Sequence, residues 1–145
     1  MCSQGDSKEA LEGPLLYTFV LIVATLLWRD SLPGVVAVST MAAGDGMADI
    51  VGRKFGKSNK WPFSESKSFA GSAAFFVSSL IASFGLTTWL SFTGSGIAGN
   101  IASGDLFWKL AIVCFVSTIV ELLPIGDDNW TVPAAAAIGI LILNQ

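Results

Sequence analysis

The chain contains no histidine, only two cysteines and few charged residues. Of its 145 residues, 13% are Asp, Glu, Lys or Arg, whereas a soluble domain carries about a quarter. The missing histidine excludes histidine general bases and metal sites that contain histidine. Cys2 and Cys114 lie in a polar tail and in an apolar run, a placement that does not indicate a disulfide framework. The formal net charge of −3 indicates no nucleic-acid partner.

Apolar residues dominate what is present. Hydrophobic types make up 52% of the chain, and the mean hydropathy is +0.66. This composition excludes a disordered chain, a collagen and a coiled coil. It also argues against an ordinary soluble domain, whose surface needs polar residues. We therefore expect a membrane protein or a fragment of one, with a soluble helical core as the alternative.

Five apolar segments predict the fold. A helix that spans a bilayer needs about 20 mainly apolar residues. Segments that approach this length run over 15–28, 32–51, 68–92, 106–125 and 130–143. We expect an all-α, multi-pass transmembrane bundle of about five membrane helices. Residues 1–14 then form a polar N-terminal tail, and residues 15–145 form the membrane-embedded domain.

Five crossings also predict a topology. The tail, the basic segment 53–67 and the segment 125–129 fall on one face of the membrane, and the segments 29–31 and 93–104 fall on the other. The basic segment holds Arg53, Lys54, Lys57, Lys60 and Lys67. Because excess Lys and Arg marks the cytoplasmic or stromal side, we expect this face to be the inner one.

Asp45 and Asp49 are four residues apart, so on a helix they share a face. Like charges at this spacing are mutually destabilising, and an Asp inside a membrane helix costs about 3 kcal/mol. A cation between the two carboxylates offsets both effects. Mg²⁺ suits this position because it takes one or two carboxylates, waters and phosphates. The alternative is that both acids lie at a helix end in water.

Glycines and cations surround and follow the two acids. They include Gly44, Gly46, Gly52, Arg53, Lys54, Gly56, Lys57, Lys60, Lys67, Ser68 and Gly71. Glycine leaves room for close approach of a ligand, and cations neutralise phosphates, so the segment predicts a polyphosphate site. Lys67 is the strongest candidate because it precedes the electropositive N-terminus of a helix. The alternative is that the cations set topology and contact anionic lipids.

A second acidic cluster is expected at the same membrane level. Glu121 ends the fourth apolar segment, and Asp127, Asp128 and Asn129 follow it. Taken alone, the last three are typical of a solvated turn. Together with the first acids and the basic segment, they indicate metal-assisted phosphoryl transfer, in which catalysis rests on positioning and charge neutralisation.

Three motifs carry a resemblance to a known family. AGDGMADIVGRKFG, KSFAGS and ELLPIGDDNWTVP resemble the polyprenol kinase family, above all plant-type phytol kinases and farnesol kinases. The positions in register are Asp45, Ala48, Gly52, Gly56, Lys67, Ser68, Gly71, Glu121, Pro124, Asp128 and Asn129. Members are usually longer, with additional N-terminal helices, so the chain resembles their C-terminal half. Trp130 departs from the pattern that usually follows the Asp-Asn pair.

The resemblance implies a CTP-dependent kinase that phosphorylates a prenyl alcohol, such as phytol, farnesol or geranylgeraniol, within a lipid bilayer. It also implies a link to tocopherol and isoprenoid metabolism. The implied location is a chloroplast membrane, with the endoplasmic reticulum or another endomembrane as the alternative. The sequence does not separate these alcohols.

This hypothesis assigns roles to the site residues. Asp45, Asp49 and Asp128 hold Mg²⁺ on the CTP phosphates, and Asp128 is the candidate to accept the proton of the alcohol. The residues assigned to the triphosphate are Lys67, Arg53, Lys54, Gly52, Gly56 and Gly71. The prenyl chain is expected to lie along 68–92.

Other functions stay open at this point. A cytidylyltransferase that makes a CDP-lipid shares the use of metal and CTP but attacks a different phosphorus. A cation-coupled transporter or channel would use Asp45, Asp49 and Glu121 as an ion path. A third possibility is a short form without activity that serves as an interaction partner.

Overall fold

A computed structural model describes residues 15, 17–26, 31–64, 67–94, 105–123 and 128–143, with the backbone alone for 128–130. In these residues the chain is helical apart from turns, bends and one isolated antiparallel bridge between Lys60 and Ser68. The all-α prediction is confirmed for this part of the chain. The predicted polar tail, residues 1–14, lies outside it.

Each described helix falls on a predicted apolar segment. Residues Leu32–Ser39 (α2), the π-helical stretch Thr40–Asp45 (η1) and Gly46–Phe55 (α3) form one continuous helix. The others are Tyr17–Leu26, Phe69–Phe92 (α4), Leu106–Leu122 (α6) and Asp128–Leu143 (α7).

Three helix ends differ from the prediction, and one of them is the end of α6, which lies at Leu122 and not at residue 125. The second segment continues past residue 51 to Phe55, so Arg53 and Lys54 lie in the last turn of α3 rather than in a loop. The sequence GRKF contains no residue that stops a helix, and cations are favourable near a helix C-terminus. The last helix begins at Asp128, so this residue lies in a first helical turn and not in the preceding loop.

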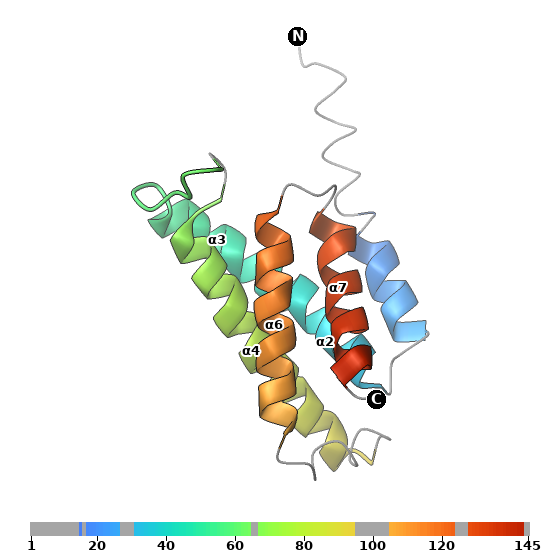
Figure 1. The fold of residues 1–145 in the computed structure, drawn as a ribbon. Helices are drawn as coiled ribbons and strands as arrows, with labels where there is room; N and C mark the ends of the chain where they lie inside the picture. The colour runs from blue at the N-terminus through green and yellow to red at the C-terminus, as the bar shows by residue number, and fades with distance from the viewer. Residues whose placement is uncertain are drawn as a thin grey trace.

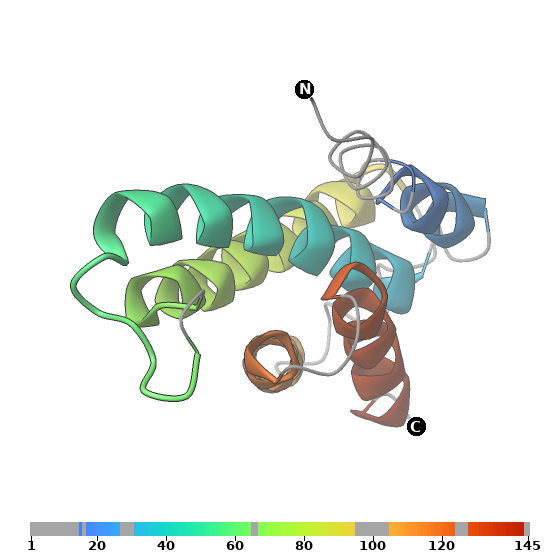
Figure 2. The same cartoon turned by 90° about the horizontal axis from the view of Figure 1, so that it is seen from above.

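Successive helices run in alternating directions along the bundle (Figure 1). The continuous helix α2–η1–α3 lies side by side with α4, and α6 and α7 pack against this pair from one side (Figure 2). As a result, the C-terminal ends of α3 and α6 lie at the same end of the bundle as the N-terminal ends of α4 and α7 (Figure 1). This end carries the predicted site.

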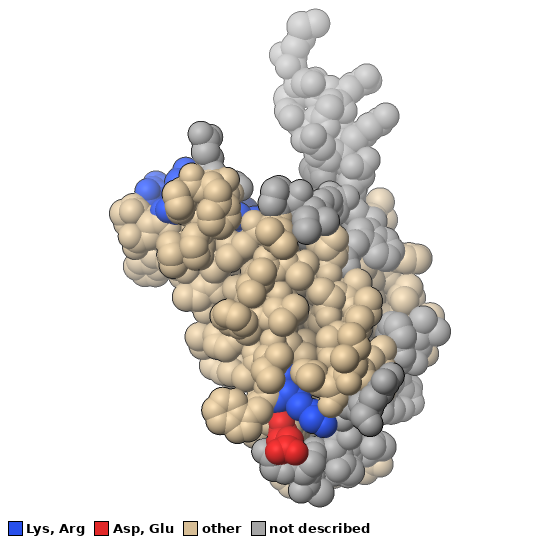
Figure 3. Space-filling view, viewed as in Figure 1, with Lys and Arg blue, Asp and Glu red and all other residues tan. Residues whose placement is uncertain are grey.

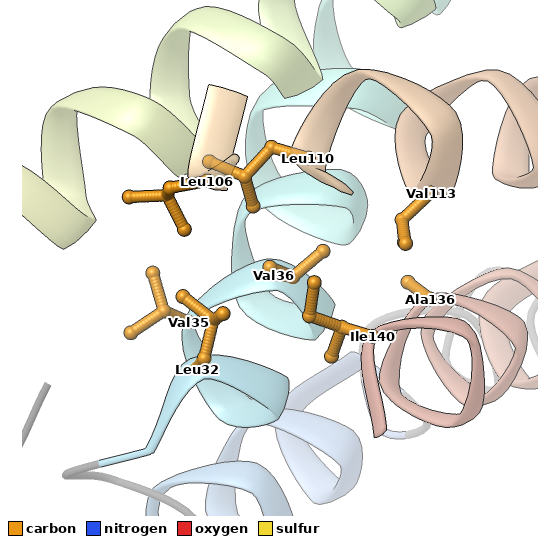
Figure 4. Packing of buried hydrophobic residues seen from close by; sticks show 8 residues of the cluster. All are labelled: Leu32, Val35, Val36, Leu106, Leu110, Val113, Ala136 and Ile140. Carbon is orange, nitrogen blue, oxygen red and sulfur yellow. The ribbon is translucent and has the colours of Figure 1, made fainter. Parts of the chain in front are cut away.

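The apolar core lies between α2, α6 and α7 (Figure 4). Its buried side chains are Leu32, Val35, Val36, Leu106, Leu110, Val113, Ala136 and Ile140. The core lies toward the end of the bundle where α2 and α6 begin. The buried face of α4 is different, because it carries hydroxyl side chains such as Ser79, Ser83 and Thr87. Small residues of this kind let helices approach closely.

The outer surface is largely apolar. Large exposed side chains include Ile81, Trp89, Phe115 and Ile142. On the face shown in Figure 3, the coloured charged residues gather at two ends of the molecule, with an uncharged band between them. Such a continuous apolar surface favours burial in lipid or against another protein surface.

Two of the described helices are long and apolar enough to cross a membrane, namely Leu32–Phe55 and Phe69–Phe92. Helix α6 has 17 residues and α7 has 16, which is shorter than a full span at 1.5 Å per residue. Membrane association is therefore compatible with the structure, and the bundle of about five spans stays a prediction.

Candidate functional site

A pocket of about 270 Å³ opens between α3, α4 and the C-terminal end of α6. Its lining residues are Asp45, Ala48, Asp49, Gly52, Arg53, Lys67, Ser68, Gly71, Ser72 and Glu121. All of these except Ser72 are candidate residues from the sequence. Three separate parts of the chain therefore bring their predicted residues to one place.

The carboxylates of Asp45 and Asp49 enter the pocket from one face of the same helix. Both residues are exposed rather than buried in the bundle. The guanidinium of Arg53 donates a hydrogen bond of 2.6 Å from Nε to Oδ1 of Asp49. Since both partners are exposed, this pair adds little to stability. Arg53 therefore partly neutralises the negative charge of Asp49 before any ligand binds.

The π-helical stretch Thr40–Asp45 directly precedes this acidic face. Such wide turns are uncommon and frequently occur at functional sites. The hydroxyl of Thr40 donates to the carbonyl oxygens of Val36 and Ala37, each at 3.0 Å, which satisfies a polar side chain that is fully buried. The periodicity of the sequence did not predict this stretch.

Glycines allow α3 and α4 to pack closely beside the pocket. A Cβ atom at Gly71 would lie 3.2 Å from the carbonyl oxygen of Ala48 and 3.5 Å from Cα of Gly52. A Cβ at Gly56 would overlap the carbonyl oxygen of Gly52 and Oγ of Ser68, and one at Gly44 would overlap Oγ of Ser79. At positions 44, 56 and 71 the space is thus occupied by protein atoms.

This packing corrects part of the prediction. The sequence suggested that the glycines leave room for a ligand, but at Gly44 and Gly56 they leave room for neighbouring protein atoms. Gly52 and Gly71 both line the pocket. At Gly46 a Cβ would meet nothing within 4 Å, so the side chain is missing there without a packing reason.

Ser68 is the N-cap of α4. Its Oγ accepts a hydrogen bond of 3.1 Å from the amide of Gly71, and its carbonyl oxygen accepts one of 3.1 Å from Oγ of Ser72. The amide of Phe69 donates to the carbonyl oxygen of Asn59 at 2.8 Å. Two of the first amides of α4 are therefore used internally, which leaves fewer donors for a phosphate than the sequence suggested.

The segment between α3 and α4 is held by Trp61, a residue that the motifs did not include. Its indole Nε1 donates to Oγ of Ser72 at 3.2 Å, and its ring stacks on Phe69 with the ring centroids 3.6 Å apart. Its amide donates to the carbonyl oxygen of Lys67 at 3.2 Å. Trp61 therefore fixes the backbone of Lys67 next to the pocket.

Lys67 and Glu121 form an ion pair across the pocket. Nζ of Lys67 donates to Oε1 of Glu121 at 2.6 Å, and the side chains are 27% and 6% exposed. The second oxygen, Oε2, is buried and has no hydrogen-bond partner among the described residues. The pair joins residues 54 positions apart in the sequence. The motif that contains Lys67 and the motif that contains Glu121 did not predict this contact.

The electrostatics of the lining favour a divalent cation. Three carboxylates and two cations line the pocket, so its lining has one negative charge in excess. A triphosphate alone would be repelled, whereas a bound Mg²⁺ reverses the balance. Asp45 and Asp49 are the exposed carboxylates of the lining that could hold such a cation. No three acidic or cysteine side chains within the described residues form a complete metal cluster.

Some of the predicted site residues are not among those that line the pocket. Pro124 and Asp127 lie outside the described residues, as do the side chains of Asp128 and Asn129. Lys54 is exposed, with Nζ 5.4 Å from the ring centroid of Phe55, and it does not line the pocket.

The fold and the site define a class: a helical protein with an apolar exterior and a polar pocket of acids, cations and glycines at one end. Similar proteins carry more specific names. The chain is 40% identical over 144 residues to a wheat (Triticum aestivum) protein named "Probable phytol kinase, chloroplastic". It is 39% identical over 136 residues to phytol kinase 1, chloroplastic, and 35% identical over 147 residues to farnesol kinase, chloroplastic, both from Arabidopsis thaliana.

These alignments cover 97%, 91% and 99% of this chain, but 47%, 43% and 46% of the relatives. The chain thus spans about half the length of the curated relatives it matches. The resemblance to plant phytol and farnesol kinases that the motifs predicted is confirmed. No family model matches the chain. No solved structure matches it either.

Proposed function

We propose that this chain carries the nucleotide and phosphoryl-transfer site of a kinase that phosphorylates a prenyl alcohol. One observation carries the proposal most directly: a single pocket gathers the carboxylates of η1 and α3, the cation before α4 and the buried acid at the end of α6. The names of the relatives support phytol or farnesol as the alcohol. CTP as the donor rests on the motif resemblance.

We assign some pocket residues to the metal ion and others to the phosphates. Asp45 and Asp49, with Asp128 from the start of α7, would hold Mg²⁺, which would neutralise charge on the phosphates and bridge them to the protein. Lys67 lines the same pocket, and its ammonium group is the proposed partner of a phosphate oxygen. Arg53 lines the pocket from α3. The two cations are thus the proposed ligands of a triphosphate.

The proposed reaction needs no covalent enzyme intermediate. The hydroxyl oxygen of the alcohol attacks the γ-phosphorus, the bond from that phosphorus to the β–γ bridging oxygen breaks, and CDP leaves. The proton of the hydroxyl passes to a carboxylate, for which we propose Asp128. The product is the prenyl monophosphate. Catalysis then rests on in-line positioning and charge neutralisation.

The proposed setting is a membrane of the chloroplast. The relatives named above are called chloroplastic, and a prenyl alcohol is dissolved in lipid. The polar pocket lies at one end of a bundle whose exterior is apolar. At that end, a water-soluble nucleotide and a lipid-soluble alcohol can meet. A role in the supply of phytyl phosphate for tocopherol synthesis is part of the proposal.

Labelled CTP tests the reaction. The chain and an N-terminally extended version are each expressed in membranes and incubated with a panel of phytol, farnesol and geranylgeraniol. We expect label at the γ-phosphate of CTP to enter the lipid product, and label at the α-phosphate to stay in the nucleotide. Transfer of α-label would instead identify a cytidylyltransferase. Absence of both with either version would contradict the proposal.

A further inference from the structure

A second cavity, of about 230 Å³, lies between the helix Tyr17–Leu26, α2 and α7. Its lining side chains are all apolar, and they include Val20, Ala37, Pro133 and Ala137. Small side chains from three helices create this space, because an alanine leaves room where a leucine would fill the gap. The cavity is separate from the polar pocket and has no role in the proposed handling of the nucleotide.

A buried cluster connects the wall of the polar pocket with the helix that lines the cavity. Val132 is buried and packs with Ala48 and Phe75, and Ala48 lines the polar pocket. The next residue, Pro133, lines the apolar cavity. The end of the cavity at Pro133 is therefore one residue along α7 from a side chain that packs against the pocket wall.

The cavity extends along α7 and reaches the exposed surface of the bundle. Its lining on α7 runs from Pro133 to Leu141, which at 1.5 Å per residue is about 12 Å along the helix axis. Ala134 and Ile138 line the cavity and are also exposed. A chain that enters beside these residues can continue into the surrounding lipid.

We propose that this cavity holds the isoprenoid chain of the alcohol, with the end of the chain that carries the hydroxyl at Pro133, next to the buried cluster of Val132, Ala48 and Phe75. This inference rests on the proposed function. Burial of the chain among apolar side chains is favourable by about 25 cal/mol per Å². The occupant is thus a molecule with a long apolar body and one polar end.

This assignment differs from the one that the sequence suggested, which placed the chain along 68–92. In the structure, the buried face of α4 carries hydroxyl groups such as Ser79 and Ser83. Its exposed apolar face carries Val77, Ile81 and Trp89, and these side chains do not line the second cavity. The apolar cavity beside α7 fits a hydrocarbon better than this polar seam.

Photo-crosslinking tests the location without any need for turnover. A farnesol analogue with a diazirine on its second isoprene unit is irradiated with the full chain in lipid nanodiscs, and cross-linked peptides are mapped. We expect labels within 17–26 and 133–141. Labels within 69–92, or no specific label, would overturn the proposal. Kinase activity is measured on the same samples, so a failed location and a failed function give different results.

A substitution at the mouth of the cavity gives a second readout. Ala134→Phe adds bulk where the side chain is exposed, so the fold tolerates it. We expect KM for farnesol to rise on the order of tenfold, with KM for CTP unchanged and little effect on a five-carbon prenyl alcohol. Ala73→Phe on the exposed side of α4 is the matched control and leaves all three values unchanged.

Two results would overturn the proposal in this arm. One is an Ala134→Phe variant that behaves like the Ala73→Phe control with every alcohol. The other comes from the N-terminally extended chain: loss of cross-links at 133–141 with activity retained would mean that a helix of the longer chain occupies the cavity.

Discussion

At the scale of single residues, the ion pair of Lys67 and Glu121 distinguishes this site from a simple acidic patch. A carboxylate that is 6% exposed is costly to bury unless a cation and hydrogen bonds compensate for lost water. Lys67 supplies one such contact, and Oε2 lacks a partner among the described residues. Glu121 thus positions the ammonium group, and its open oxygen can accept a donor from a ligand.

Replacing Lys67 and replacing Glu121 should lower the stability of the protein by different amounts. Lys67→Ala leaves a buried carboxylate unpaired, which we expect to cost about 3 kcal/mol. Glu121→Gln leaves a lysine that is 27% exposed and can turn toward water, so its cost is smaller. Thermal unfolding of both variants in one detergent measures the difference. Equal losses would contradict the burial argument.

Asp45 is expected to be essential for activity and not for folding. It is exposed at the pocket, so Asp45→Asn removes a charge that Mg²⁺ needs without opening a hole in the core. We expect loss of kinase activity with unchanged expression in membranes. Asp105→Asn is the control, since Asp105 is an exposed acid that does not line the pocket. Normal turnover by Asp45→Asn would reject its role.

At the scale of helices, apolar run length predicted the location of each described element, because the run itself favours burial. The ends were less predictable. Nothing in GRKF stops the helix, so it continues to Phe55, and the capping bonds of Ser68 set the start of α4. The π-helical stretch could not be predicted, since it depends on how Gly44 packs against α4 and not on local pattern.

Gly56 and Gly46 form a matched pair for testing helix contacts. Gly56→Ala places a Cβ against Gly52 and Ser68, which we expect to destabilise the protein by about 1–3 kcal/mol. Gly46→Ala meets open space and lies in a helix, where Ala is preferred over Gly by up to about 1 kcal/mol. Unfolding midpoints should therefore move in opposite directions. A shift of the same sign in both would contradict the packing.

At the scale of the whole molecule, the motifs predicted which residues meet and the structure supplies how they meet. The sequence placed Asp45, Lys67 and Glu121 on one side of a bundle from topology alone. It could not predict the 2.6 Å contact of the last two, since their approach depends on the packing of α4 against α6. It also gave no sign of the cavity beside α7, whose alanines resemble any small helix residues.

The predicted membrane topology can be tested with single cysteines. In a background with Cys2 and Cys114 replaced by Ala, one Cys is placed at Lys57 and another at Thr93, both of which are exposed. An impermeant maleimide added to sealed vesicles of known orientation should label the two from opposite sides. A Cys at Lys60 serves as the control for the Lys57 side. Labelling of all three from one side would contradict the alternating crossings.

The stretch Thr40–Asp45 sets the rotational phase of the remainder of its helix. Each residue of an α-helix advances the side chains by about 100°, and a π turn takes in roughly one residue more than an α turn. Deleting one residue from this stretch would convert the π turn into an α turn, so the acidic face of α3 would keep its direction relative to α2. The extra residue is thus taken up inside the stretch, and Asp49 and Arg53 keep the face of the helix that lines the pocket.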